Sequence, residues 1–181
     1  MKELKLKRQS MDVTRVHAKA LALYIESIKQ FREIGIEESE SHWTAQRIVR
    51  KWTEELIQVY KPNKLSEGVV ALLKESNIPL DRARNCGYNS QTTKSGLGFA
   101  NGIGKGSGTG LLHFEHMSPI SRLIDMCLEL PEITSDTVWT CIMKNCEIAW
   151  ILKSERKRLD KICKSGERSD EILESLNIVI K

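Results

Sequence analysis

A glycine-rich segment divides this chain into parts of different character. Seven of its eleven glycines lie between Gly96 and Gly110. Glycine loses more backbone entropy on ordering than any other residue, so such a run does not hold one conformation by itself. We expect a helical N-terminal region at 1–84, a flexible basic loop at 85–110 and a second structured region at 111–181.

The N-terminal region has apolar residues at helical spacing. The first predicted helix has its apolar face at positions 13, 16, 20, 24, 28 and 31 and stops at Gly35. The second runs from about Trp43 to Tyr60, before Pro62. A third follows Ser66, a suitable N-cap residue.

The region after the glycine run mixes strands and helices. Strands are predicted at 111–116, 148–152 and 177–180. Helices are predicted at 120–130, from Thr134 or Ser135 to about Asn145, from Glu155 to about Cys163 with Ser154 as cap, and at 170–176. The expected fold class is therefore α+β and mostly helical.

Composition limits the class of protein. Hydrophobic residues make up 40% of the chain and charged residues 29%, as in soluble globular proteins. No apolar run approaches the ~20 residues of a membrane span, and the basic N-terminus leads into no signal core. We expect a cytoplasmic protein that has no membrane partner. The five cysteines include no C-x-x-C pair, which favours reduced and mostly buried thiols.

Positive charge is clustered although the net charge is only +4. No acidic residue occurs between Arg82 and Phe114, and residues 141–168 hold eight basic and four acidic side chains. Such clusters suit a polyanion, and a solvated helix face is the alternative for either one. The candidate nucleic-acid-binding residues are Lys94, Lys105, Lys153, Arg156, Lys157, Arg158 and Lys161.

The predicted strand at 111–116 ends in Glu115-His116, a carboxylate beside an imidazole. In the helix after the next strand, Glu155, Leu159 and Ile162 share one stripe, which makes Glu155 the inward acid. If Glu155 faces the strand end, two carboxylates and an imidazole surround one point, as in a hard-metal site with a base. The alternatives are a capping role for Glu155 and purely structural contacts for the Glu-His pair.

At residues 111–162 the chain resembles a degenerate HNH (ββα-metal) nuclease core, of the kind found in phage-type HNH-like proteins. The resemblance rests on Glu115-His116-x-x-Pro119, Asn145, the apolar strand and the helix from Ser154. It implies a ββα-metal-like core that carries a helical insertion, with a C-terminal extension. The Cys-x-x-Cys pairs and the helix histidine common in that family are absent.

The resemblance also implies Mg²⁺ or Mn²⁺ and phosphodiester hydrolysis. His116 would activate water and Asn145 would position the site, while Glu115 and Glu155 would hold the metal ion. We therefore expect a metal-dependent DNA endonuclease with a histidine general base. The alternatives are a non-catalytic nucleic-acid-binding protein on the same scaffold and a helical protein-interaction module.

Overall fold

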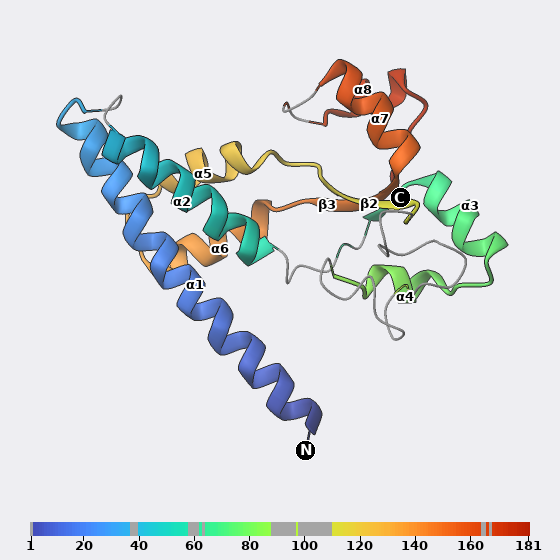
Figure 1. Ribbon diagram of the computed structural model, residues 1–181, viewed down its shortest axis with the longest axis horizontal. Coiled ribbons are helices and arrows are strands. Elements are labelled where there is room, and N and C mark those ends of the chain that lie inside the picture. Colours follow the sequence, from blue (N-terminus) through green and yellow to red (C-terminus); the bar gives the residue numbers. More distant parts are fainter. Residues whose placement is uncertain are drawn as a thin grey trace. The chain divides into compact units, whose positions relative to one another are not determined.

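The computed structural model describes residues 2–36, 40–57, 62, 64–87, 97, 110–163, 166 and 168–181, with α1 side chains from residue 16 and α2 side chains over 43–53 (Figure 1). It divides into two compact units. The helical unit is Met1–Ile57 with Ile120–Cys146, and the sheet unit is Gln58–Pro119 with Glu147–Lys181. Most of the predicted loop at 85–110 lies outside the described residues.

The helical unit consists of helices that bury a shared apolar core. Its members are α1 (Lys2–Glu33), α2 (Glu40–Ile57), α5 (Ile120–Leu128) and α6 (Ser135–Asn145). The helix α1 packs against the other three, and α5 also contacts α2 and α6. Leu21, Ile25 and Ile28 of α1 are fully buried. Their spacing of three to four residues gives α1 an apolar stripe, but the stripe is not the predicted one. Of the predicted face only Ile28 is buried, whereas Val16 is 64% exposed and Leu21 and Ile25 take the buried positions; the side chain at position 13 lies outside the described residues.

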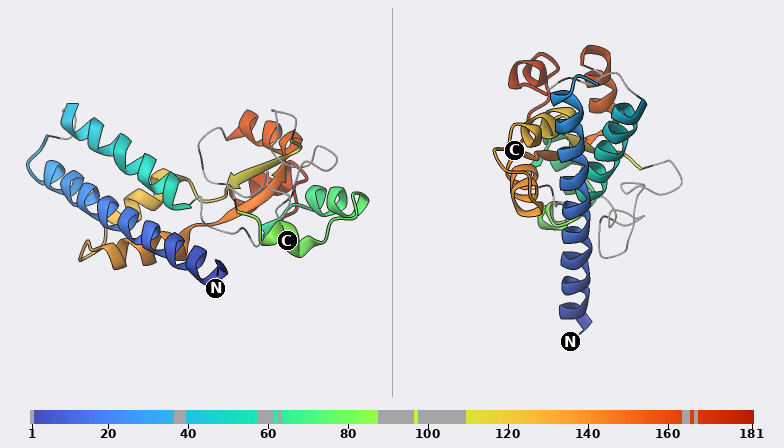
Figure 2. Two further views of the ribbon diagram at one scale, coloured as in Figure 1. Left: turned by 60° about the horizontal axis from the view of Figure 1, so that its bottom comes forward. Right: turned by 90° about the vertical axis from the view of Figure 1, so that its left-hand side faces the viewer.

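The sheet unit contains a small mixed sheet. Its elements are β1 (Lys64–Leu65), α3 (Glu67–Glu75), α4 (Leu80–Arg84), β2 (Leu112–His116), β3 (Ile148–Leu152), α7 (Lys153–Ile162) and α8 (Asp170–Ser175). The strand order is β1-β3-β2. The central strand β3 is parallel to β1 and antiparallel to β2, with Glu115 opposite Ala149. The helix α7 packs on β2 and β3, and α3 packs on β3 (Figure 2).

The segment 148–152 is apolar throughout because it forms the central strand β3, which is covered by the rest of the sheet unit. Residues 148–151 are all buried, and the indole of Trp150 has no exposed surface. The Trp150 Nε1 donates to the Cys86 carbonyl at 3.2 Å, so the one polar atom of the ring has a partner. Phe114 on β2 meets the Trp150 ring edge-on at 5.1 Å.

Local signals placed several helix ends correctly. The Ser66 Oγ accepts from the Val69 amide at 3.2 Å and caps α3, and Thr134 caps α6. Gly35 follows α1 with φ of 73°, a left-handed conformation that glycine adopts without steric cost. The described chain is α+β and mostly helical, as expected.

Other expectations need correction. The strand β1 and the helix α4 have no prediction, because two and five residues are too few to show a period. The expected strand at 177–180 is only a bridge between Ile180 and Ser66. The helix α7 begins at Lys153 with Leu152 as its N-cap residue, and Ser154 is exposed and does not cap it.

The two units divide the chain differently from the boundaries expected at 84 and 110. The helices α5 and α6, inserted between β2 and β3, pack with α1 and α2, while residues 64–84 join the sheet. Helices pack together when this buries their apolar faces, even when they are far apart in the sequence. Among the described residues, none of the helices combines the length and the hydropathy that crossing a bilayer requires.

Candidate functional site

Glu115, the first predicted metal ligand, lies at the centre of a cluster of ionic side chains. It projects from β2 and is only 3% exposed. Its Oε1 accepts from the Nε of Arg168 at 2.8 Å, and Arg168 is itself buried. Its Oε2 lies 3.1 Å from the Nε2 of His113 and 3.6 Å from the Nε of Arg156.

Asp160 completes this ion cluster, which we define as His113, Glu115, Arg156, Asp160 and Arg168. The Nε of Arg156 donates to Asp160 Oδ2 at 3.0 Å, one turn along α7. Arg156 also contacts the His113 ring. The two carboxylates of the cluster thus lie among two guanidiniums and an imidazole. The two negative charges of the carboxylates equal the two positive charges of the guanidiniums.

The chain holds Arg168 in place through its own backbone. The Arg168 amide donates to the Met117 carbonyl at 3.4 Å, and Met117 in turn donates to the Glu147 carbonyl at 2.8 Å. The Arg168 guanidinium also donates to the carbonyl oxygens of Cys163 and Gly166. These bonds fix the guanidinium against the end of β2, so Glu115 has a cation beside it in the folded chain.

The pKa shifts of Glu115 and Arg168 both favour the charged form of the side chain. Burial by itself raises the pKa of Glu115, but the contacts with His113 and Arg168 outweigh it and hold the pKa below its usual value. Burial lowers the pKa of Arg168, and the hydrogen bond with Glu115 raises it to a net increase. Both groups are therefore charged at neutral pH.

Glu155, the second predicted metal ligand, is also buried, at 5% exposure, but it has different partners. Its Oε2 accepts from the Ser66 hydroxyl at 2.6 Å and from the Leu152 amide at 2.7 Å. The second bond satisfies an otherwise unpaired N–H at the start of α7. A Cβ on Gly68 would lie 2.7 Å from Glu155 Oε1, so the carboxylate fits closely against α3. Of the two roles considered for Glu155, the structure therefore shows the helix-capping one.

His116 and Glu115 lie on opposite faces of β2, because successive side chains of a strand alternate. The His116 ring meets the Phe114 ring at 5.9 Å with an interplanar angle of 81°. His113, as expected, shares the face of Glu115. Asn145 belongs to the helical unit, where its amide donates to the Cys141 carbonyl at 2.7 Å, within its own helix. Within the sheet unit, Glu115 and Glu155 therefore bond to different partners, and His116 lies on the face of β2 opposite Glu115.

The basic candidates separate into two groups. Lys157, Arg158 and Lys161 are exposed on α7, as expected. Arg156, also expected to face solvent, is instead half-buried in the ion cluster. A further basic candidate, Lys153, is partly buried, while Lys94 and Lys105 lie outside the described residues.

The inward stripe of α7 is shorter than predicted. Leu159 is fully buried, as expected, but Ile162 is 57% exposed at the end of the helix. The three members of the ion cluster that were not site candidates are His113, Asp160 and Arg168. No periodicity signals Arg168, because its partner Glu115 lies 53 residues earlier in the chain.

A divalent cation does not fit these residues. Among the described residues, no group forms a hydrogen bond of good geometry with the buried Glu115 Oε2, a feature that favours a metal ligand. However, the nearest groups to this oxygen are His113 and Arg156, and Arg168 holds the other oxygen. Mg²⁺ and Mn²⁺ prefer several oxygen ligands, and two adjacent guanidiniums repel them. Within the described ranges, no three His, Cys, Asp or Glu side chains form a group able to hold a metal ion.

The cysteines lie apart from this chemistry. All five are free thiols, and Cys86, Cys127 and Cys146 are buried. Burial raises the pKa of the Cys146 thiol to about 12, so it stays protonated and unreactive near neutral pH. These features agree with the expectation of reduced, mostly buried thiols.

The β2–β3–α7 order has the strand, strand and helix sequence that the HNH resemblance implies, with the expected helical insertion between the strands. The metal-binding character of that core has no support from the side-chain contacts. Comparison of the chain with models of protein families, with curated proteins and with solved structures found no match.

Proposed function

We propose that this protein binds nucleic acid through the exposed face of α7 and does not hydrolyse it through a metal ion at Glu115. The observation that carries the proposal is a division of the basic side chains of α7. Arg156 is neutralised within the ion cluster, whereas Lys157, Arg158 and Lys161 are exposed. Arg156 therefore contributes to the ion cluster, and the three exposed cations of α7 remain accessible to a polyanion.

The geometry of these outer cations suits a phosphate backbone. Lys157 and Lys161 are one turn apart, about 6 Å along the helix axis, on the same face. The Arg158 guanidinium donates to the Leu176 carbonyl at 2.7 Å, which orders it beside α8. Lysine contacts to phosphates release counterions and carry no sequence information, so the expected binding is salt-sensitive and sequence-tolerant.

Replacing Lys157 and Lys161 together by Gln tests this surface. We expect weaker binding to every duplex sequence alike, and a plot of log K against log salt that is flatter by about 2, one for each lost contact. Both side chains are exposed, so the free energy of unfolding should change by no more than about 1 kcal/mol. The measurement is a titration of labelled duplex DNA at several salt concentrations.

The matched control is the double variant Lys74→Gln and Arg84→Gln, which removes the same charge from exposed positions on α3 and α4. Its affinity and salt slope should equal those of the wild type. If both double variants lose affinity equally, the binding reflects net charge alone and α7 is not the binding surface.

A second candidate function, the metal-dependent DNA endonuclease, has one observation in its favour. The Glu115-His116 pair ends a strand that is followed by the β3–α7 pair in the order that the HNH resemblance implies. The test is incubation of supercoiled plasmid with Mg²⁺ or Mn²⁺, with a chelator as control. Because the carboxylates are engaged by Arg168 and Ser66, we expect no metal-dependent nicking.

The variant His116→Ala decides between the two functions. If the binding proposal is correct, neither wild type nor His116→Ala nicks the plasmid, and the two proteins bind DNA with the same affinity. If instead the wild type nicks plasmid with metal and His116→Ala loses about 10²–10⁴-fold in rate, His116 is a general base and the endonuclease is correct.

A further inference from the structure

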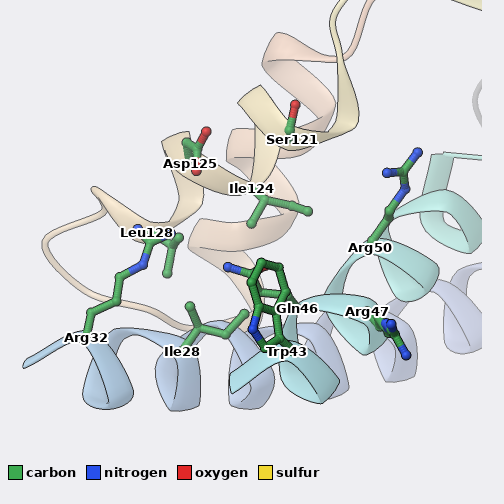
Figure 3. Close-up of a pocket in the computed structure, with 10 residues that line it drawn as sticks. All are labelled: Ile28, Arg32, Trp43, Gln46, Arg47, Arg50, Ser121, Ile124, Asp125 and Leu128. Carbon is green, nitrogen blue, oxygen red and sulfur yellow. The ribbon is translucent and has the colours of Figure 1, made fainter. Parts of the chain in front are cut away.

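The helical unit has a cavity that the α7 proposal does not use. It lies between α1, α2 and α5 and has a volume of about 340 Å³ (Figure 3). That is within the usual range for sites that bind small molecules. The three helices supply an apolar floor and a polar rim, so the cavity has the mixed chemistry of a ligand site.

The floor contains an aromatic side chain that the fold leaves accessible. Trp43 of α2 is 53% exposed and lines the cavity with Ile28, Ile124 and Leu128. By contrast Trp52, on the same helix, is partly buried and packs edge-on against the His17 ring at 4.7 Å. A large exposed aromatic beside aliphatic side chains is typical of a surface that a flat ligand covers.

The rim is cationic. Arg32 of α1 and Arg47 and Arg50 of α2 line the cavity, and Asp125 is the one acidic residue among the described residues that line it. Trp43, Arg47 and Arg50 are spaced i, i+4 and i+7, which places them on one face of α2. In Figure 3 both arginines of α2 lie on one side of Trp43, and Arg32 lies on the other. The pair of arginines on α2 matches a ligand that carries negative charge at one end.

We propose that this cavity binds a nucleotide, with the base stacked on Trp43 and the phosphate held by Arg47 and Arg50. Bases stack on aromatic rings whatever their identity, and guanidiniums bind phosphate oxygens through paired N–H groups. Gln46, beside Trp43, carries both a donor and an acceptor for the edge of the base. The site belongs to the helical unit and does not depend on binding by α7.

The ligand chemistry is shared by a free nucleotide and by one nucleotide of a single strand, and the test separates them. Tryptophan fluorescence and calorimetry are followed while the full chain is titrated with AMP, with a short oligothymidylate and with inorganic phosphate. Of the four tryptophans, Trp43 is exposed and Trp150 is fully buried, so a ligand on Trp43 quenches the solvent-accessible part of the emission. We expect AMP or the oligonucleotide to bind at least tenfold more tightly than phosphate.

Variants of the cavity identify the contacts. Trp43→Ala should weaken nucleotide binding by about tenfold, the loss of one stacked base, and Trp43→Phe should restore most of it. Arg47→Gln should weaken it by about tenfold or more, the loss of a charge-assisted hydrogen bond. The control Lys19→Gln removes an exposed charge of α1 that does not line the cavity and should leave the affinity unchanged.

The outcomes are distinct. Equal affinity per site for AMP and the oligonucleotide identifies a free nucleotide as the ligand, and much tighter oligonucleotide binding that still needs Trp43 identifies a single strand. Binding of phosphate as tight as AMP, or nucleotide binding indifferent to both Trp43→Ala and Arg47→Gln, overturns the proposal. Thermal melts monitored by circular dichroism confirm that each variant is folded.

Discussion

Glu115→Gln is expected to lower the free energy of unfolding by about 3–5 kcal/mol, the usual cost of removing one partner from a buried ion pair. The side chains of Glu115 and Arg168 are only 4% and 5% exposed, so the variant removes the nearer counter-charge of a buried guanidinium, whose Nη2 lies 4.0 Å from Asp160 Oδ1. The measurement is urea unfolding at pH 7, followed by circular dichroism. A cost below about 1 kcal/mol would falsify the structural role that the ion cluster gives to Glu115.

The control is an exposed ion pair of the same unit. Lys64 pairs with Glu147, and their side chains are 43% and 44% exposed, so Lys64→Gln should cost no more than about 1 kcal/mol. The double variant Glu115→Leu and Arg168→Met removes both buried charges and should recover most of the lost stability, because two apolar groups replace the pair.

The pH dependence of stability follows from the same pair. The pKa of Glu115 is lower in the folded chain than its ordinary value of about 4.3, so its contribution is fully present above that pH. The contribution is lost as the pH falls from there through the folded pKa. Between pH 7 and pH 3 the wild type should therefore lose more stability than Glu115→Gln, whose residue 115 does not titrate.

Glu155→Ala is the second large effect, with an expected loss of about 2–4 kcal/mol. The variant leaves the buried Ser66 hydroxyl and the Leu152 amide without their acceptor, and each such loss costs about 1–3 kcal/mol. Glu155→Gln keeps an acceptor oxygen and should cost only about 1 kcal/mol. Unfolding of both variants in urea gives the comparison.

A chelator separates capping from metal binding at this position. If Glu155 acts through Ser66 and Leu152, a chelator leaves the stability of the wild type unchanged. A wild-type protein that the chelator destabilises to the level of Glu155→Ala would show instead that a bound metal ion accounts for the effect. The exposed control Glu67→Ala should change stability little.

Local features of the sequence were sufficient for much of the secondary structure. Ser66 and Thr134 cap helices because a hydroxyl three residues before a backbone amide needs no distant partner. The apolar run at 148–152 is a strand that is covered on both faces, and its length and composition already favour that. The period-two alternation of β2 likewise places His113 and Glu115 on one face through their spacing alone.

For the candidate site, the sequence determined that Glu155 needs partners, and the tertiary structure alone decided which groups meet Glu155 and Glu115. An inward carboxylate requires a cation or hydrogen-bond donors, and the spacing of Glu155 and Leu159 was enough to show that Glu155 is inward. Yet Arg168 lies 53 residues from Glu115, and Ser66 lies 89 residues from Glu155. Helical and strand periodicity relate residues only within one element. Whether a buried charge meets a metal ion, a guanidinium or a hydroxyl therefore depends on how β1, β2, β3 and α7 pack together.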